Sequence, residues 1–169
     1  MLAIHQLVRY WENVRAVTLE YMDIYPPDSL DFKPVDSVFT ARDQFQHLIS
    51  SETMFVRGWL DGLWEFPWRE GRWCAVDLVD DSFEYLDGLK RYYEQVHLRA
   101  LGFLRGLPPE GGSRVLRTHL GDLSIDAMVL YAIDEEIHHR AQIAVYLRML
   151  GTHPPFFGQR YQELTDGDE

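Results

Sequence analysis

Apolar residues recur three and four positions apart in four long segments of this chain, and that spacing is typical of amphipathic α-helices. The first segment covers residues 4–25 and ends at Pro26, because proline cannot continue a helix. The second begins where Thr40 and Asp43 resemble a capping box, and it continues to about Leu60. The first half of the chain is therefore predicted to form two long helices.

The second half carries two more segments of the same kind. One begins at residue 81 or 82 and runs to Leu107. The other runs from Ser124 to Leu150, where Gly151 takes the position that commonly closes a helix. A Gly-rich turn separates them. These elements predict an all-α fold, a four-helix bundle with a long crossover between its second and third helices.

The crossover is predicted from residues 61–79, which carry Gly, Pro and three tryptophans without a sustained period. The segment is long for a turn between antiparallel helices, so we expect it to join parallel ones. Trp64, Trp68 and Trp73 either anchor the crossover or line the mouth of a pocket. Cys74, the single cysteine, is interpreted as a small buried hydrophobe or as a reactive thiol.

Length and charge limit the classes of function. A chain of 169 residues suits one hydrophobic core and no linker divides it, so we expect one domain over residues 1–169. Its 16 basic and 27 acidic residues give a net charge of -11, which argues against a nucleic acid or a membrane surface as partner. Neither a membrane span nor a secretory signal is visible. We expect a cytoplasmic protein with a small-molecule substrate.

The fourth helix places polar residues within its apolar face. The residues on that face are Met128, Ala132, Glu135, His139, Gln142 and Tyr146. A carboxylate and an imidazole are costly to bury unless they are paired or bind a cation. Glu135 and His139 stand about one turn apart and can reach a single ion, whereas His138 is rotated by roughly 100° around the helix.

His47 is the candidate for a further ligand from another helix, because it lies in mid-helix beside Leu48, with Ser51 on its own face. Two explanations stay open at this point. Either His47, Glu135 and His139 hold one metal ion, or Glu135 and His139 share a hydrogen bond within the core of the bundle.

A second metal hypothesis uses two Glu-x-x-His strings, Glu94 to His97 and Glu135 to His138, whose spacing is that of di-iron carboxylate bundles. Those bundles usually place the two strings on alternate helices, whereas here they fall on consecutive ones. The helix order therefore argues against a di-iron site and favours a His97 that packs near Tyr93.

Two motifs resemble the DinB/YfiT-like family of metal-binding bundles. RDQFQHLISSETMFVRGWLDG is similar to the family's second-helix segment with a ligand histidine, and DFKPVDS fits the segment before it. EEIHHRAQIAVYLRMLG is similar to a fourth-helix segment of the form HxxxHRGQ followed by YLRxLG. The resemblance covers roughly residues 1–151, and it implies a metal-binding bundle with a long crossover.

The resemblance implies a ligand set with one departure. His47 and His139 match ligand histidines, whereas Glu135 stands where the family usually has histidine and Ala141 replaces the usual glycine. Two histidines and one carboxylate still form a familiar three-ligand set for one divalent metal ion. A carboxylate suits harder ions, so manganese or iron become candidates beside zinc and nickel. Loss of the metal in this member stays an alternative.

Function is inferred from the same resemblance. Some family members are metal-dependent transferases or isomerases that use bacillithiol, mycothiol or glutathione, so we expect a metal-dependent thiol S-transferase. His138 and Gln142 are candidates for orienting substrate or supporting the ligands. A metal-dependent hydrolase and a stress-associated protein without catalytic activity remain the alternatives.

Family members often pair, so we expect a homodimer. A short docked helix is predicted after Pro155, with Phe156, Phe157 and Tyr161. Aromatic residues of this segment and of the crossover are the candidates for an apolar patch that a two-fold partner would cover.

Overall fold

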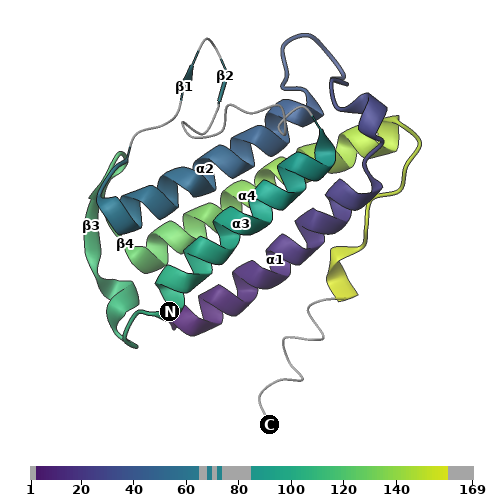
Figure 1. Ribbon diagram of the computed structural model, residues 1–169. Helices are drawn as coiled ribbons and strands as arrows, with labels where there is room; N and C mark the ends of the chain where they lie inside the picture. Colours follow the sequence, from purple (N-terminus) through teal and green to yellow (C-terminus); the bar gives the residue numbers. More distant parts are fainter. Residues whose placement is uncertain (1–2, 65–67, 70–71, 74–84, 160–169) are drawn as a thin grey trace.

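The computed structural model describes residues 3–64, 68–69, 72–73 and 85–159. Its four long helices are α1 (Ile4–Ile24), α2 (Ala41–Asp61), α3 (Leu86–Arg105) and α4 (Ile125–Met149). They lie side by side as a bundle (Figure 1). The predicted all-α four-helix fold is confirmed.

The helix ends follow the capping residues that the sequence predicts. At the start of α2, the Thr40 hydroxyl accepts a hydrogen bond from the backbone N–H of Asp43, and the Asp43 carboxylate accepts one from the backbone N–H of Thr40. Ser124 caps α4 by accepting from Ala127. Gly151 follows α4 with φ of 80°, a left-handed conformation that glycine adopts without strain. The predicted start of the third helix lies outside the described residues.

The crossover joins two parallel helices, as predicted. α1 and α2 each pack against both α3 and α4. α1 and α2 therefore lie diagonally opposite each other in the bundle. The direction of α2 and α3 follows from two contacts along their interface. Glu52 accepts a hydrogen bond from His97, and seven residues further on Trp59 stacks on Phe103. Because both helices advance together, the chain must return along the length of the bundle between them.

Short antiparallel strands lie within that return path. β1 (Trp68–Arg69) pairs with β2 (Arg72–Trp73), and β2 lies against α2. Before them, the Trp64 ring packs directly on α2, because a Cβ at Gly58 would lie only 2.4 Å from it. Trp64 therefore anchors the start of the crossover. The side chains of Trp68 and Trp73, and all of Cys74, lie outside the described part of the chain.

A second hairpin, not predicted from the sequence, closes one end of the bundle (Figure 1). After the 3-10 helix η3 (Gly111–Ser113), β3 (Val115–Thr118) pairs antiparallel with β4 (Gly121–Ser124). A two-residue turn joins the strands, and Gly121 has φ of 102°. The hairpin leads directly into the cap of α4.

The segment after α4 contains a short 3-10 helix, η4 (Phe157–Gln159), but it does not dock as expected. Phe156 is 72% exposed and Phe157 is 51% exposed, so neither ring is buried against the bundle. Tyr161 lies outside the described residues. The homodimer stays a prediction.

The core of the bundle consists of two apolar clusters with a polar layer between them. One cluster includes Trp11 and Trp59, and the other includes Tyr25 and Phe45. The buried polar residues of the layer include Arg15, Thr18, Gln44, His47, Glu52, His97, Glu136, His139 and Arg140. The functional candidates therefore lie in the middle of the bundle.

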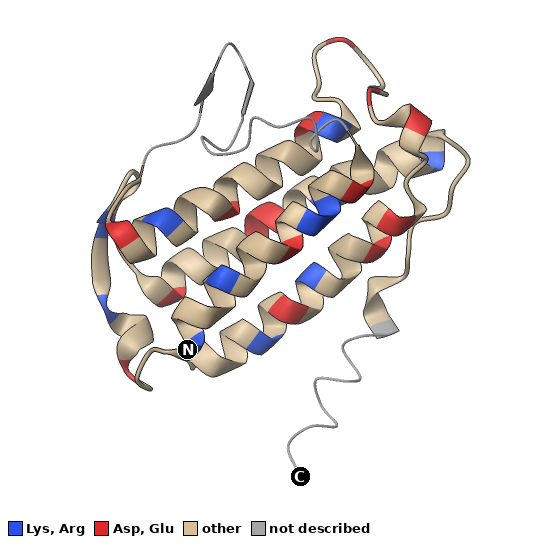
Figure 2. Ribbon diagram, viewed as in Figure 1, with Lys and Arg blue, Asp and Glu red and all other residues tan. Residues whose placement is uncertain are grey.

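Charged residues are spread along all four helices in the view of Figure 2. Among the described residues, no helix has both the length and the apolar character that a membrane span requires.

Candidate metal centre

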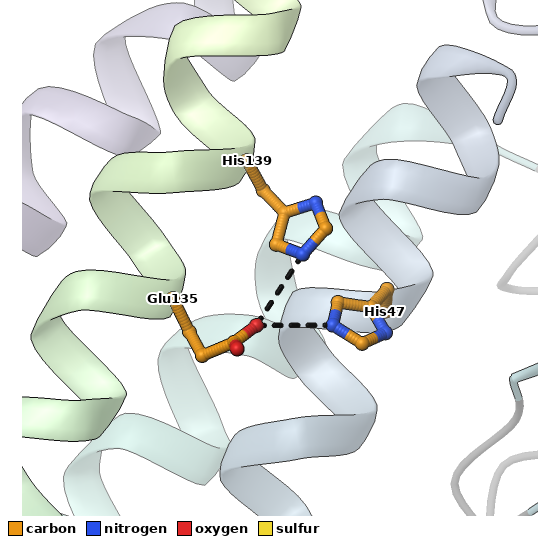
Figure 3. Close-up of side chains that lie close together, drawn as sticks. All are labelled: His47, Glu135 and His139. Carbon is orange, nitrogen blue, oxygen red and sulfur yellow. Dashed lines mark hydrogen bonds and ion pairs between the residues drawn. The ribbon is translucent and has the colours of Figure 1, made fainter. Parts of the chain in front are cut away.

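Three side chains from two facing helices meet near the middle of the bundle. His47 comes from α2, and Glu135 and His139 come from α4 (Figure 3). The Oε2 atom of Glu135 lies 3.2 Å from Nε2 of His47 and 3.3 Å from Nε2 of His139. One ligand atom from each residue lies within 4.8 Å of the others, so the three fit a divalent metal ion. We call them the histidine cluster.

Helix geometry brings the predicted residues together. Glu135 and His139 are four residues apart and therefore share a face of α4. α2 runs antiparallel to α4, as two hydrogen bonds indicate. Gln44 of α2 bonds to Gln142 of α4. His47 lies about one turn later on α2, and its partner Glu135 lies one to two turns earlier on α4. All three predicted ligands thus face one another.

Access to the cluster is set by its burial. Both imidazoles are buried, whereas 23% of the Glu135 side chain is exposed. The Phe39 ring lies 6.4 Å from the His47 ring, and the Ser51 hydroxyl lies 3.4 Å from Nε2 of His47. Glu135 is therefore the member of the cluster that is most exposed to solvent.

A chain of side-chain amides continues from the cluster to the surface. The Nδ1 atom of His139 bonds to the carbonyl Oε1 of Gln44. The Gln44 amide nitrogen donates to Oε1 of Gln142 at 2.6 Å, and the Gln142 amide nitrogen lies 2.8 Å from Nε2 of the exposed His138. Gln142 and His138 were predicted from the sequence, whereas Gln44 was not. Its position one turn before His47, on the same face, is the signal that would have found it.

The tautomer of His139 decides what can lie between this ring and Glu135. When Nδ1 of His139 donates to Gln44, a neutral ring presents the lone pair of Nε2 to the Glu135 carboxylate, 3.3 Å away, and a metal ion between them would satisfy both acceptors. In the other tautomer, Nε2–H itself donates to Glu135.

Electrostatics favour a neutral His139 beside an ionised Glu135. Burial lowers the pKa of His139 below the ordinary value of an imidazole, which opposes the cationic ring at neutral pH. Hydrogen bonds from His139 and His47 hold the pKa of Glu135 well below its usual range, so the carboxylate stays ionised. Burial, reinforced by the Glu135 charge, raises the pKa of Tyr131 to about 12, and its hydroxyl hydrogen-bonds to Glu135. An ionised Glu135 and a neutral His139 have the charge state that a divalent ion requires of its ligands.

The structure does not bring the four residues of the di-iron hypothesis together, so that hypothesis is wrong. Glu94 is exposed on α3, whereas His97 is buried and bonds to Glu52 of α2. His138 is exposed and faces Gln142 instead of Glu135. Adjacent helix positions point about 100° apart, which separates His138 from the histidine cluster.

A second buried cluster was not predicted from the sequence. The guanidinium of Arg15 donates to Glu52 at 2.6 Å and to Glu136 at 2.9 Å, and His97 bonds to Glu52 at 2.8 Å. The Trp11 indole also donates to Glu136, at 3.0 Å. We call Arg15, Glu52, His97 and Glu136 the Arg15 cluster. The sequence feature that could have indicated this cluster is Arg15 itself, a charged residue one turn after the buried Trp11.

The two clusters are adjacent. A cavity of about 10 Å³, close to the least that can hold one water molecule, lies between them. Ser51 and Glu135 line it from the side of the histidine cluster, and Arg15 and Glu136 line it from the other side. The polar layer of the bundle is therefore nearly continuous.

Comparison with known proteins gives consistent matches. The DinB family model matches residues 1–169. A Bacillus subtilis (strain 168) protein described as the uncharacterized protein YjoA is 24% identical over 157 residues, which cover 92% of this chain and 97% of that protein. These matches agree with the resemblance of the two sequence motifs.

Solved structures show the same fold. The crystal structure of the DinB-like protein YjoA from Bacillus subtilis has a TM-score of 0.68 and 21% identity, covering 90% of this chain and 97% of that one. That of a DinB-like protein from Bacillus cereus ATCC 10987 has a TM-score of 0.73 and 17% identity, covering 91% and 97%. The DinB family model matches the whole length of this chain, so the chain belongs to the DinB family.

Proposed function

We propose that the protein holds one divalent metal ion at His47, Glu135 and His139, and that it is a metal-dependent S-transferase for a low-molecular-weight thiol. The observation that carries the metal site is the convergence of one carboxylate and two imidazoles from two facing helices, with one ligand atom from each residue within 4.8 Å of the others. The choice of thiol transfer rests on the family resemblance.

The types of ligand atom in the histidine cluster limit which metal ions suit the site. Two imidazole nitrogens suit zinc or nickel, and the carboxylate makes manganese or iron acceptable as well. Three protein ligands leave coordination positions for an exchangeable ligand, as in catalytic metal sites. A bound divalent ion would lower the pKa of a thiol that joins it, which supplies a nucleophile at neutral pH.

The residues of the chain have separate roles in this proposal. His47, Glu135 and His139 hold the ion, and the exposed edge at Glu135 admits the thiol and its electrophilic partner. Phe39 offers an apolar surface beside His47. Ser51 lies within reach of His47 and offers a hydroxyl that can hydrogen-bond to a ligand beside that ring.

Metal binding is tested first. Protein purified without chelator and supplemented with zinc, nickel or manganese should retain about one ion per chain by elemental analysis. The His139→Ala variant should lose it, whereas His153→Ala, which removes an exposed histidine just beyond α4, should not. If the unaltered protein takes up no ion, the proposal fails.

Thiol transfer is tested on the loaded protein. An electrophile such as monochlorobimane is incubated with bacillithiol, mycothiol or glutathione in turn, and its consumption is followed by fluorescence. We expect thiol-dependent consumption by the loaded protein that His139→Ala abolishes. Consumption of ester or amide substrates without any thiol would instead identify a hydrolase, and no turnover with any thiol would contradict the transferase.

A further inference from the structure

Gln44 is fully buried on α2, and both ends of its amide are used. Its carbonyl faces Nδ1 of His139, and its amide nitrogen donates to Gln142 at 2.6 Å. Nothing in the motif resemblance assigns a role to this residue. A polar side chain at 0% exposure is expected to have a structural or functional partner, and the partner of its carbonyl is a candidate metal ligand.

We propose that Gln44 is a positioning residue of the metal centre, which accepts a hydrogen bond from the Nδ1–H of His139 and so leaves Nε2 of that ring for the ion. This inference rests on the proposed function. A histidine that binds a metal through one ring nitrogen usually donates the other N–H to an acceptor, and that bond fixes both the tautomer and the ring orientation. The Gln44 carbonyl has the position and the chemistry of that acceptor.

Gln142 supports this orientation of the Gln44 amide. If the Gln44 amide turned over, its NH₂ group would face Nδ1 of His139, and the proton of a neutral ring would move to Nε2, where it blocks metal binding. The Gln142 carbonyl accepts from the Gln44 nitrogen and therefore opposes that turn. The Gln142 amide nitrogen in turn lies 2.8 Å from Nε2 of His138. From His139 to His138, each side chain of this chain thus donates its hydrogen bond in the same direction.

A purely structural role makes a different prediction from a positioning role. If Gln44 only links α2 to α4, every substitution should act through stability. If it positions His139, a side chain that accepts a hydrogen bond should replace it, whereas an apolar one of similar size should not. Gln44→Glu and Gln44→Leu make this comparison.

The experiment measures zinc affinity by competition with a chromophoric chelator, together with the melting temperature of the metal-free protein. Gln44→Leu should weaken zinc binding by about 10- to 100-fold, the usual loss when such a supporting partner is removed. Gln44→Glu should bind zinc as the unaltered protein does, because its carboxylate accepts a hydrogen bond from the Nδ1–H of His139. Gln95→Leu, at an exposed glutamine of α3, is the matched control and should change neither quantity.

Each outcome decides the proposal. Equal zinc affinity in Gln44→Leu and the unaltered protein would overturn the positioning role and leave the proposed function standing. An equal loss in Gln44→Leu and Gln44→Glu would also overturn it, in favour of a structural role. If Gln44→Leu does not fold, Gln142→Leu replaces it, with a smaller loss expected and an unchanged affinity overturning the role. An unaltered protein that binds no zinc, nickel or manganese would overturn both the positioning role and the proposed function.

Discussion

Glu135 and Glu136 are neighbours on α4, yet they enter two different clusters. Glu136 is fully buried, and although burial works to raise its pKa, the charge of Arg15 lowers it. Glu135 is partly exposed and faces the imidazoles of His47 and His139. One carboxylate has a permanent cation from the protein itself, and the other does not.

The difference distinguishes a structural carboxylate from one that can bind an external cation. Both members of the Arg15–Glu136 pair are buried, and their mutual attraction compensates the loss of hydration. The histidine cluster consists of one carboxylate and two imidazoles, without the permanently charged guanidinium of the other cluster, so it can accept a divalent ion from outside. Substitutions in the two clusters should therefore affect different quantities.

The largest effect is expected from Arg15→Met, which leaves Glu52 and Glu136 buried without their cation. Removing one partner of a buried ion pair costs about 3–5 kcal/mol. The free energy of unfolding, measured by urea denaturation of the metal-free protein, should fall by that amount. Arg99→Met, at an exposed arginine of α3, is the control and should change it little. A loss no greater than in the control would show that the Arg15 cluster is not structural.

The two clusters should also respond to acid at different pH. Metal affinity should begin to fall below pH about 6.5, the ordinary pKa of an imidazole, and should fall about tenfold per pH unit for each protonating histidine. The lowered pKa of His139 moves its own contribution to lower pH. Zinc titrations from pH 8 to pH 5 measure this fall, and an affinity independent of pH would contradict histidine ligands.

Unfolding of the metal-free bundle should follow only at lower pH. The folded pKa of Glu136 is lowered, so its contribution to stability is present above the unfolded value of about 4.3 and is lost as pH falls further. Circular dichroism against pH should therefore show helix loss below about pH 4, after the metal has been released. Simultaneous loss of metal and helix would contradict the separation of the clusters.

A smaller change is expected at Glu135, in binding and not in folding. Glu135→Ala should weaken metal binding by at least about tenfold, because one of three ligands is lost, while Glu135→His should retain the ion and shift preference towards zinc or nickel. Isothermal titration of both variants gives the affinities. Unchanged affinity in Glu135→Ala would mean that the carboxylate does not contact the ion.

The smallest effect is expected from Tyr131→Phe. The variant loses a hydrogen bond to Glu135, whose net worth is about 1 kcal/mol, or about fivefold in metal affinity. The same titration measures it. A loss as large as that of Glu135→Ala would indicate that Tyr131 does more than support the carboxylate.

The sequence predicted the features that depend on helical period. The spacing of apolar residues located the four helices, and the same period placed Glu135 and His139 on one face. His47 on the second helix was named as a candidate ligand from its mid-helix position, and the motif around it supported that prediction. One sequence alone does not reveal which helix faces which. The DinB family match confirms that resemblance, while the metal itself remains a prediction.

The features that were missed depend on contacts between distant segments. Arg15 and Glu52 come from α1 and α2, and no spacing within either helix predicts that they meet. Gln44 lay on the correct face, but its partner His139 is 95 residues away. The β3–β4 hairpin consists of four-residue strands, which are too short for a clear alternating pattern.

The separation of the proposed ligands along the chain has a kinetic consequence. His47 and Glu135 are 88 residues apart, and they come from helices that are not consecutive. The chain must close a long loop before both can contact one ion, so the ion contributes little until the bundle is nearly assembled. Interactions that form after the transition state slow unfolding without accelerating folding. Stopped-flow measurements should therefore find that bound metal lengthens the lifetime of the native bundle and leaves its rate of formation almost unchanged.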